Sequence, residues 1–442
     1  METVVVYSAG TSARLKFVLD WVLKERLHIS YTITTNEADI AGLPFFISYG
    51  KKLPNSISIP DEQLLWGKGI QKTDPKTASW NNIPTLFDAA DKGCDLPFDM
   101  FSAIFYLLSR YEEYYTQKQD KHGRYPASQS ILYKKSWLLR PLVDEWVTAF
   151  RKKLVAASGL HIAPTQFIFQ PTYDIDMAYS HLYKGVGRIM GAYVRALIKG
   201  DVKQINERTK VLKKKQKDPY DSFRWLRQLH KQYELRPLYF VLCSLKTTQY
   251  DKNVHPEHPA MVRVIKNLAK EGTIGMHPSY YHDRSTVMDS EKAVLEQVSG
   301  TTINISRQHY IRVRLPQTYH MLLEKGITED YSMGYGSHLG FRAGTGNSFP
   351  WYDLEKEMVT ALRIYPFCFM DTTAHHESKL SVAEAFGRLD AMAAKLQQTG
   401  STMITVFHNF SLGTSAEWKG WRNAYDHFIR EQATILTQHN LV

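Results

Sequence analysis

Beyond residue 165, short apolar segments recur along the chain, and most of them end in charged or polar residues. Helical patterns separate several of these segments, and an alternation of strand and helix favours parallel pairing of the strands. In a barrel of parallel strands the functional groups gather at the carboxyl ends, which is where the polar residues fall here. The sequence therefore predicts an α/β fold with a (β/α)7-type barrel. The expected strands are 166–172, 237–242, 272–276, 302–305, 337–341, 367–370 and 402–407, and the expected helices include 222–233, 259–271, 289–299 and 382–399.

The first 165 residues follow a different pattern, in which short β-runs alternate with helices. The clearest helices are expected at 98–115 and 141–157, and the segment 157–164 has the composition of a linker. A chain of 442 residues is longer than one ordinary core accommodates. We therefore predict two domains, a smaller α/β domain of unknown role at 1–165 and the β/α barrel at 166–442.

The net charge of +11 is concentrated in one segment of the predicted barrel. Residues 182–236 contain 15 Lys and Arg against 5 Asp and Glu, with Lys213, Lys214, Lys215 and Lys217 close together. We predict a basic helical insertion there. Such a patch can attract phosphates, nucleic acid or anionic lipid headgroups, but no nucleic-acid-binding motif accompanies it. The segment is either a docking site for an anionic surface or polymer, or a solvated helical hairpin.

The sequence also indicates where in the cell the protein is expected. The first 27 residues read as a β-run, a turn and an amphipathic helix, unlike a signal peptide. No apolar stretch approaches the roughly 18 residues that span a bilayer. The 3 cysteines, Cys94, Cys243 and Cys368, are far apart and indicate neither a disulfide framework nor a thiolate zinc site. The expected location is the cytoplasm.

Two carboxylates follow the first strand of the predicted barrel. Asp174 and Asp176 come after an apolar run, and both can face the barrel mouth if the chain stays extended there. One could then bind a metal while the other acts as a base. A helix N-cap with an acidic first turn would explain such a pair about as well.

Histidines mark three further strand ends, at His277, His309 and His408. Imidazole near carboxylates is typical of zinc sites, in which three protein ligands leave one position for water. His282 lies shortly after His277 and is a further candidate ligand. Arg342, near several glycines at another predicted strand end, could orient a catalytic carboxylate or hold an oxyanion.

Four motifs, taken in order, resemble the polysaccharide deacetylase (carbohydrate esterase) family. They are Thr-Tyr-Asp-Ile-Asp at 172–176, Ile-Gly-Met-His at 274–277, Phe-Arg-Ala-Gly at 341–344 and Val-Phe-His-Asn at 406–409. The resemblance covers roughly residues 166–430 and is greatest to longer bacterial members that carry an extra N-terminal domain. It implies an irregular β/α barrel that uses a divalent metal, commonly zinc, to hydrolyse N-acetyl groups of amino sugars.

The resemblance also implies roles for particular residues. By position, Asp174 resembles the catalytic base, Asp176 and His277 metal ligands, Arg342 the arginine that positions the base, and His408 the acid that protonates the leaving amine. Asp371, in a Met-Asp-Thr-Thr run, resembles the aspartate that orients this last histidine.

The sequence departs from the family pattern around the predicted metal site. The family has adjacent aspartates, whereas Ile175 separates them here, and Tyr281 occupies the place of its second histidine. The third ligand is therefore either His282, one residue later, or His309 from the neighbouring strand. A strand end fixes an imidazole better than a loop does, which favours His309.

The sequence thus predicts a metal-dependent hydrolase, with Zn²⁺ as the expected metal, that removes N- or O-acetyl groups from a carbohydrate. Two alternatives remain open. One is a barrel-type glycoside hydrolase that uses two carboxylates, such as Asp174 and Asp371, without a metal. The other is a non-catalytic carbohydrate-binding or scaffold protein with a degenerate site. Activity that survives chelation would favour the first alternative, and failure to bind metal the second.

Overall fold

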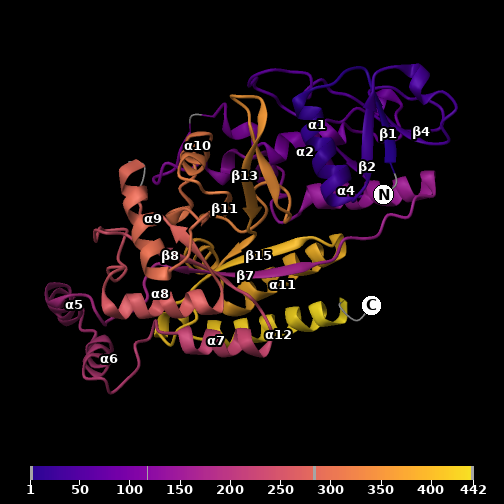
Figure 1. Ribbon diagram of the computed structural model, residues 1–442. Helices are drawn as coiled ribbons and strands as arrows, with labels where there is room; N and C mark the ends of the chain where they lie inside the picture. Colours follow the sequence, from indigo (N-terminus) through magenta and orange to yellow (C-terminus); the bar gives the residue numbers. More distant parts are fainter. Residues whose placement is uncertain (1–2, 117, 282–284, 440–442) are drawn as a thin grey trace.

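The computed structural model describes residues 3–116, 118–281 and 285–439, and it has a smaller N-terminal sheet beside a larger curled sheet (Figure 1). The N-terminal sheet is parallel, with the order β2-β1-β3-β4. Its strands are β1 Thr3–Ser8, β2 Ser30–Thr34, β3 Phe46–Tyr49 and β4 Ser56–Ile59, and a separate hairpin joins β5 Thr77–Trp80 to β6 Ile83–Leu86. The helices of this part are α1 Ala13–Leu19, α2 Met100–Leu108, α3 Ile131–Lys134 and α4 Leu142–Ser158.

Side-chain caps explain where the N-terminal helices begin. The Ser12 hydroxyl accepts a hydrogen bond from the Leu15 N–H at the start of α1, and the Asp99 carboxylate accepts one from the Ser102 N–H at the start of α2. The two helices expected in this region are present as α2 and α4, although α2 is shorter than its pattern indicated.

The larger sheet has nine strands in the order β12-β13-β11-β10-β9-β8-β7-β15-β14 among the described residues. Every neighbouring pair is parallel except the β12–β13 hairpin. The strands are β7 Ile168–Ile175, β8 Leu238–Leu242, β9 Thr273–His277, β10 Ile305–Ser306, β11 Glu329–Met333, β12 Phe349–Asp353, β13 Met358–Pro366, β14 Phe369–Met370 and β15 Thr402–His408.

The segment from β13 to β14 connects the two sides of this sheet. β13 pairs with β11, and β14 pairs with β15. Between them, the Phe367 N–H donates to the Met333 carbonyl (3.1 Å) and the Cys368 N–H donates to the Ile404 carbonyl (3.3 Å). The sheet therefore curls into an irregular barrel, which confirms the predicted fold class.

The prediction of a strand at 337–341 is wrong. This segment is a loop between β11 and β12, and β11 is the strand that follows β10 in the sheet. The loop is bound to the N-terminal part, because the Phe341 N–H donates to the Leu138 carbonyl (2.8 Å). Gly340 has φ 122°, and a Cβ there would lie 2.3 Å from the same carbonyl oxygen. The apolar residues of this loop are buried by that contact and not by a sheet.

Helices cover the outside of the barrel, and Figure 1 shows α7, α8, α11 and α12 along its lower side. The helices of this part are α5 Val186–Ile198, α6 Val202–Leu212, α7 Phe223–Gln232, α8 Pro259–Glu271, α9 Ser285–Ser299, α10 Gln317–Glu324, α11 Val382–Thr399 and α12 Trp421–His439. Short 3₁₀ or π segments lie at Asp20–Arg26, Glu37–Ile40, Ala90–Lys92, Tyr111–Glu113, Ala127–Gln129, His309–Ile311, Thr373–Glu377 and Ala416–Trp418. None of the helices in the described ranges has the length and apolar character needed to cross a membrane.

The predicted basic insertion has two different parts. Within it, α7 buries Leu226 and Leu229 and belongs to the layer of helices around the barrel. In contrast, α5 and α6 project from the body of the protein beyond α8 (Figure 1). The projecting hairpin is therefore shorter than the predicted range of 182–236.

Buried residues of the N-terminal part and of the barrel belong to one continuous apolar core. Polar contacts reinforce this junction. The Trp21 indole N–H donates to the Ser348 carbonyl (3.0 Å), and Asp144 accepts hydrogen bonds from the Thr345 hydroxyl (2.6 Å) and the Gly346 N–H (2.9 Å). The loop that follows β11 is thus held from the N-terminal side.

Candidate metal centre at the barrel mouth

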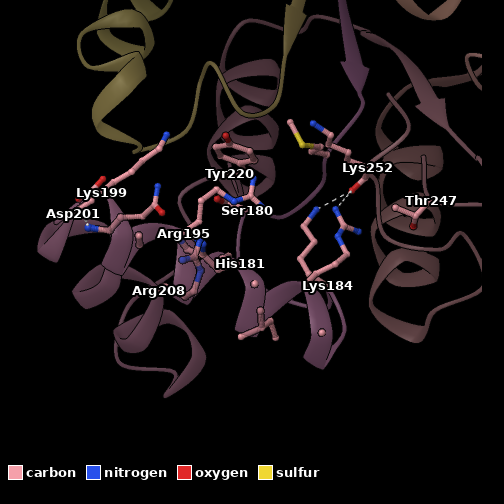
Figure 2. Close-up of a pocket in the computed structure, with 18 of the residues that line it drawn as sticks. Ser180, His181, Lys184, Arg195, Lys199, Asp201, Arg208, Tyr220, Thr247 and Lys252 are labelled. Atoms are coloured by element: carbon pink, nitrogen blue, oxygen red, sulfur yellow. Dashed lines mark hydrogen bonds between the residues drawn. The ribbon is translucent and has the colours of Figure 1, made fainter. Parts of the chain in front are cut away.

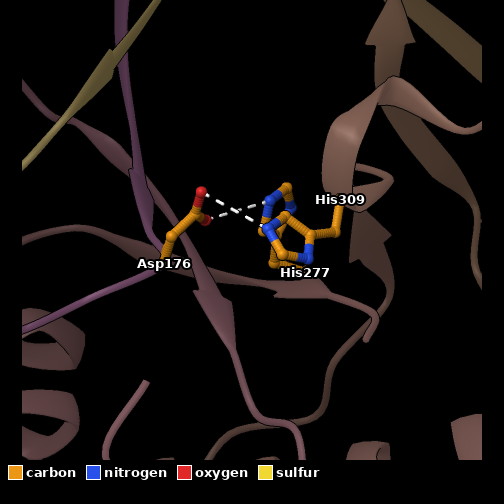
Figure 3. Close-up of side chains that lie close together, drawn as sticks. All are labelled: Asp176, His277 and His309. Carbon is orange, nitrogen blue, oxygen red and sulfur yellow. Dashed lines mark ion pairs between the residues drawn. The ribbon is translucent and has the colours of Figure 1, made fainter. Parts of the chain in front are cut away.

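Three side chains able to bind a metal meet at the mouth of the barrel, each from the end of a different strand. Asp176 follows β7, His277 ends β9 and His309 follows β10, and their ligand atoms lie within 4.8 Å of one another. His277 Nε2 lies 3.2 Å from Asp176 Oδ1, and His309 Nε2 lies 3.5 Å from Asp176 Oδ2 (Figure 3). The parallel sheet brings these strand ends together although they are far apart in the sequence.

The donor set fits a divalent cation. A carboxylate and two imidazoles are ligands that zinc takes, and three protein ligands leave one position open. Asp176 Oδ1 is buried and makes no hydrogen bond within the part of the chain that the structure describes. A buried carboxylate oxygen without a donor is costly unless a cation satisfies it. Asp176, His277 and His309 could therefore hold a metal ion.

The charges of the cluster follow from burial and proximity. Burial by itself would raise the pKa of Asp176, but His309 and His277 hold this pKa well below its ordinary value. Burial by itself would lower the pKa of His309, but Asp176 and Asp251 raise it to about 9. Metal ligation requires a neutral imidazole, so metal binding here should release a proton from His309.

Both histidines are oriented by partners on the side away from Asp176. His277 Nδ1 lies 2.6 Å from the Arg307 carbonyl oxygen, which can only accept, so Nδ1 carries the proton and Nε2 is free to ligate. His309 Nδ1 lies 3.2 Å from Asp251 Oδ1. Such partners fix the ring orientation of metal-binding histidines. Asp251 is buried in the loop after β8, where no motif drew attention to it, so sequence reasoning missed it.

Asp174 lies in β7 beside the metal cluster and is held by an arginine. Arg307 Nη1 donates to Asp174 Oδ1 (2.8 Å), and Asp174 Oδ2 lies 3.8 Å from His277 Nε2. The side chains of Arg307 and Asp174 are 0% and 2% exposed, so this ion pair is screened little by solvent. Arg307 Nε also donates to the Tyr331 carbonyl (3.0 Å), and the guanidinium lies 4.2 Å from the Phe240 ring centroid. These contacts fix the direction of Asp174.

Arg342 does not take the place expected of it. Its Nε and Nη2 donate to the two carboxylate oxygens of Glu113 (2.9 Å and 2.6 Å), a residue of the N-terminal part. The reason is the loop after β11, which runs against the N-terminal part and is not a strand that ends at the mouth. Arg307, which follows β10 and precedes the predicted ligand His309, makes the contact with Asp174 that was expected of Arg342.

His408 and Asp371 form a second pair next to the cluster. His408 Nδ1 lies 2.6 Å from Asp371 Oδ1, and the His408 N–H donates to Asp371 Oδ2 (2.7 Å). His408 Nε2 lies 3.5 Å from Asp176 Oδ2, so it points toward the centre. Burial by itself would lower the pKa of His408, but Asp371 and Asp176 raise it well above its ordinary value. The ring is thus suited to carry a proton on its Nε2.

The centre lines a pocket of about 480 Å³ that includes side chains from the N-terminal part. His122 Nδ1 lies 3.0 Å from the Tyr280 hydroxyl, and Arg124 donates to the Tyr310 carbonyl (2.7 Å). His122, Arg124 and Tyr310 all line the pocket. Sequence reasoning assigned no role to the first 165 residues and did not predict this contribution. The other candidate ligand, His282, lies outside the described residues.

A second group of possible ligands comprises His375, His376 and Glu417. His376 Nε2 lies 3.9 Å from Glu417 Oε1, and both side chains are about half exposed. The His375 ring lies 4.4 Å from that of Trp418. Exposed ligands of this kind are satisfied by water, so this group makes a weaker case for a metal than the buried cluster at the mouth.

Comparisons with known proteins cover the two parts of the chain separately. Residues 4–158 match a family described as "Family of unknown function (DUF7033)". No curated protein matches the chain in sequence.

Solved structures resemble the chain over about three-fifths of its length. A candidate polysaccharide deacetylase from Mycobacterium smegmatis is 15% identical, with a TM-score of 0.40 over 61% of this chain and 85% of that one. PuuE allantoinase is 11% identical, with the same TM-score and coverage. The catalytic domain of a peptidoglycan N-acetylglucosamine deacetylase from Eubacterium rectale is 10% identical, with a TM-score of 0.31 over 63% of this chain and 89% of that one. Polysaccharide deacetylases, the family that the four motifs resemble, are thus among the structural neighbours. Likeness at this level carries no information on activity, which is inferred below from the side chains of the site.

Proposed function

We propose that this protein is a metal-dependent hydrolase that removes acetyl groups from a carbohydrate, by cleavage of an amide or ester bond. One observation carries the proposal: a buried ligand cluster lies between an arginine-held carboxylate and an aspartate-held histidine. Asp176, His277 and His309 form the cluster. Asp174 lies beside the cluster and accepts a hydrogen bond from Arg307. His408 is held by Asp371 through Nδ1, and its Nε2 faces the cluster.

The cluster supplies the ligands for a divalent cation, and its nitrogen and oxygen donors favour zinc. Bound there, a cation of this kind would polarise an acyl carbonyl and make a water molecule more acidic. The remaining groups of the site are a base, an acid and the residues that orient them.

Asp174 is the proposed base. Its Oδ1 is engaged by Arg307, while Oδ2 lies on the side of His277 and the cluster. A carboxylate held in this way can accept a proton from an attacking water without changing its own position. Arg307 is therefore a positioning residue, which acts through Asp174.

His408 is the proposed acid. The carboxylate of Asp371 holds Nδ1, so the proton available for transfer is the one on Nε2, which faces the cluster. An amine is a poor leaving group unless its nitrogen is protonated, and a protonated imidazole at this place can supply that proton. Asp371 orients the ring and favours its protonated form.

The same contacts argue against a glycoside hydrolase that works with two carboxylates. Such a mechanism needs two carboxyl groups free to face a glycosidic bond. Both oxygens of Asp371 are engaged by His408, at 2.6 Å and 2.7 Å, so this side chain is an orienting group.

The test begins with metal analysis of the purified protein, followed by measurement of acetate released from N-acetylglucosamine oligomers and from acetylated xylan. We expect stoichiometric metal, loss of activity on chelation and recovery on addition of Zn²⁺. His277→Ala should remove both metal and activity. His427→Ala is the matched control, because His427 is 70% exposed and pairs with Glu431 on α12, away from the site. Activity that survives thorough chelation, or unchanged metal content in His277→Ala, would contradict the proposal.

A further inference from the structure

Helix α5 carries a row of large apolar side chains that no other part of the described chain covers. We define the apolar stripe as five residues that are between 52% and 81% exposed: Val186, Met190, Val194, Leu197 and Ile198. At 3.6 residues per turn these positions fall within an arc of roughly 120° on one side of the helix. An exposed row of this kind on a protein surface marks a site of interaction.

The stripe is not the face by which α5 is attached to the protein. Ala196, on another side of the helix, is buried, and the hydroxyl of Tyr193, at the edge of the stripe, lies 2.9 Å from the Thr209 hydroxyl of α6. The Arg208 guanidinium of α6 lies 5.5 Å from the Tyr193 ring centroid. The stripe itself faces solvent, since all of its residues are exposed, and Figure 1 shows α5 at the outer edge of the molecule.

The hairpin that carries the apolar stripe is strongly basic. Residues 184–217 contain 11 Lys and Arg against 2 Asp and Glu. By the helical repeat, Arg188, Arg195 and Lys199 lie on the polar face of α5, across the helix from the stripe, and all three are exposed. Further lysines follow on α6 and in the turn after it. The hairpin therefore combines an exposed apolar face with a basic polar face.

The hairpin also encloses a basic pocket of about 740 Å³ with the loops of the barrel (Figure 2). Its cations are Lys184, Arg188, Arg195, Lys199, Arg208 and Lys252. Lys184 and Arg188 both donate to the Lys252 carbonyl, at 3.0 Å and 3.4 Å, which ties the start of α5 to the barrel. Met177 and Lys252 line this pocket and the pocket of the candidate metal centre, so the two pockets adjoin.

An anionic membrane surface fits both features at once. A helix with an apolar face and a basic polar face lies in the plane of a membrane, with its apolar side chains among the acyl chains and its cations toward the headgroups. Cations near an anionic leaflet add binding energy that salt screens. A polyanion such as nucleic acid would use the charges but leave the apolar stripe in water. A protein partner would need acidic residues around an apolar groove to match.

We propose that α5 docks this protein on an anionic phospholipid membrane, with the apolar stripe inserted at the interface and the basic residues of the α5–α6 hairpin attracted to lipid phosphates. The proposal concerns binding alone and does not depend on the function proposed above.

The first test is flotation of the full chain with vesicles of phosphatidylcholine and phosphatidylglycerol in equal parts, against vesicles of phosphatidylcholine alone. We expect binding to the anionic vesicles that weakens steeply with added salt. Leu197→Gln with Ile198→Gln should weaken it on the order of 100-fold, because each buried aliphatic side chain contributes roughly a factor of ten. The matched control is Met358→Gln with Val359→Gln, an exposed apolar pair on the β12–β13 hairpin that should bind as the unchanged protein does.

The second test removes charge from the polar face of α5. Arg188→Gln, Arg195→Gln and Lys199→Gln together should weaken binding on the order of 100-fold, because each cation near the surface contributes roughly a factor of five. Its control is Lys68→Gln, Lys72→Gln and Lys76→Gln, which removes the same charge from an exposed segment of the N-terminal part.

Several outcomes would overturn the proposal. These are no binding to anionic vesicles at low salt, equal binding to neutral vesicles, or the same loss of binding in control and α5 variants. Sedimentation velocity provides a further check on the stripe. A dimer that the Leu197→Gln and Ile198→Gln pair converts to monomer, without vesicle binding, would show that the stripe pairs two copies of the chain.

Discussion

A comparison of kcat/KM and stability in Arg307→Met and Arg342→Met tests which arginine positions Asp174 for catalysis. Both arginines are buried and each pairs with a buried carboxylate, Arg307 with Asp174 (2.8 Å) and Arg342 with Glu113 (2.6 Å). Methionine keeps much of the side-chain volume in either place and removes the charge. The two variants therefore differ in which carboxylate loses its partner.

The expected effect on stability is similar for both variants. Removal of one partner from a buried ion pair costs about 3–5 kcal/mol, because the other charge stays buried without compensation. The free energy of unfolding of a folded domain is roughly 5–15 kcal/mol, so both variants should still fold at low temperature. Equilibrium unfolding in urea measures this loss and provides the folded fraction of each sample.

The expected effect on activity differs. In Arg307→Met the Asp174 carboxylate loses its Nη1 donor and is free to turn, and a misplaced catalytic group costs about 100-fold in rate. Arg342→Met should keep its kcat/KM, because Arg342 contacts Glu113 on the N-terminal side. Arg307→Lys restores the charge but not the planar fork, so it should recover part of the loss.

The assay is acetate release from an N-acetylglucosamine oligomer, with kcat/KM expressed per folded and metal-loaded molecule. Metal content should be the same in the unchanged protein and in the three variants, because neither arginine side chain is a ligand. The reasoning is refuted if Arg342→Met loses as much kcat/KM as Arg307→Met, or if Arg307→Met loses none.

Three further predictions concern the surroundings of the site and the core. Asp251→Asn should weaken metal binding about 10–100-fold, because the carboxylate oxygen that lies 3.2 Å from His309 Nδ1 and orients this ring is replaced. Competition with a chelator measures the affinity, and unchanged affinity would refute the prediction. His408→Ala should slow hydrolysis of an acetylated amino sugar by about 100-fold or more but affect hydrolysis of an aryl acetate little, because only the amine must be protonated to leave. Asp174→Asn should slow hydrolysis of both substrates. An equal effect of His408→Ala on both substrates would exclude the acid role. Burial lowers the pKa of His230 from 6.5 to about 4, so its stabilising effect is complete above pH 6.5 and is lost as the pH falls toward 4. Between pH 8 and pH 5 the free energy of unfolding should therefore fall by about 2 kcal/mol more in the unchanged protein than in His230→Gln. Urea unfolding of both proteins at the two pH values measures this, and an equal fall in the two proteins would contradict the prediction.

The sequence by itself determined the fold class and the positions from which the site is built. Short apolar runs separated by helices can bury both faces only as parallel strands under a layer of helices, and the carboxyl ends of such strands converge. Asp174, Asp176, His277, His309 and His408 all lie at such ends, so their proximity follows from the topology. The strand that was misplaced to 337–341 shows the limit of this reasoning, since a buried loop and a buried strand share an apolar composition.

Tertiary contacts determine the paths of the loops and which loop side chains reach the site. The choice of Arg307 over Arg342 depends on the path of the loop after β11, which the Leu138 carbonyl and Glu113 hold against the N-terminal part. Asp251 reaches His309 from a loop that carries no periodic pattern. Contacts of this kind join residues from separate elements through single hydrogen bonds, and no local spacing encodes them.

The clearest division between sequence and structure concerns α5. Its sequence shows an amphipathic helix with apolar residues on one side and basic residues on the other, a pattern that ordinarily places the apolar side in the core. Periodicity shows which residues share a face, but it does not show what that face meets. Here the Tyr193 side of α5 is occupied by α6, and the apolar stripe remains in solvent. Which of two faces of a helix is buried depends on the neighbours that the rest of the chain supplies, and only the assembled tertiary structure decides that.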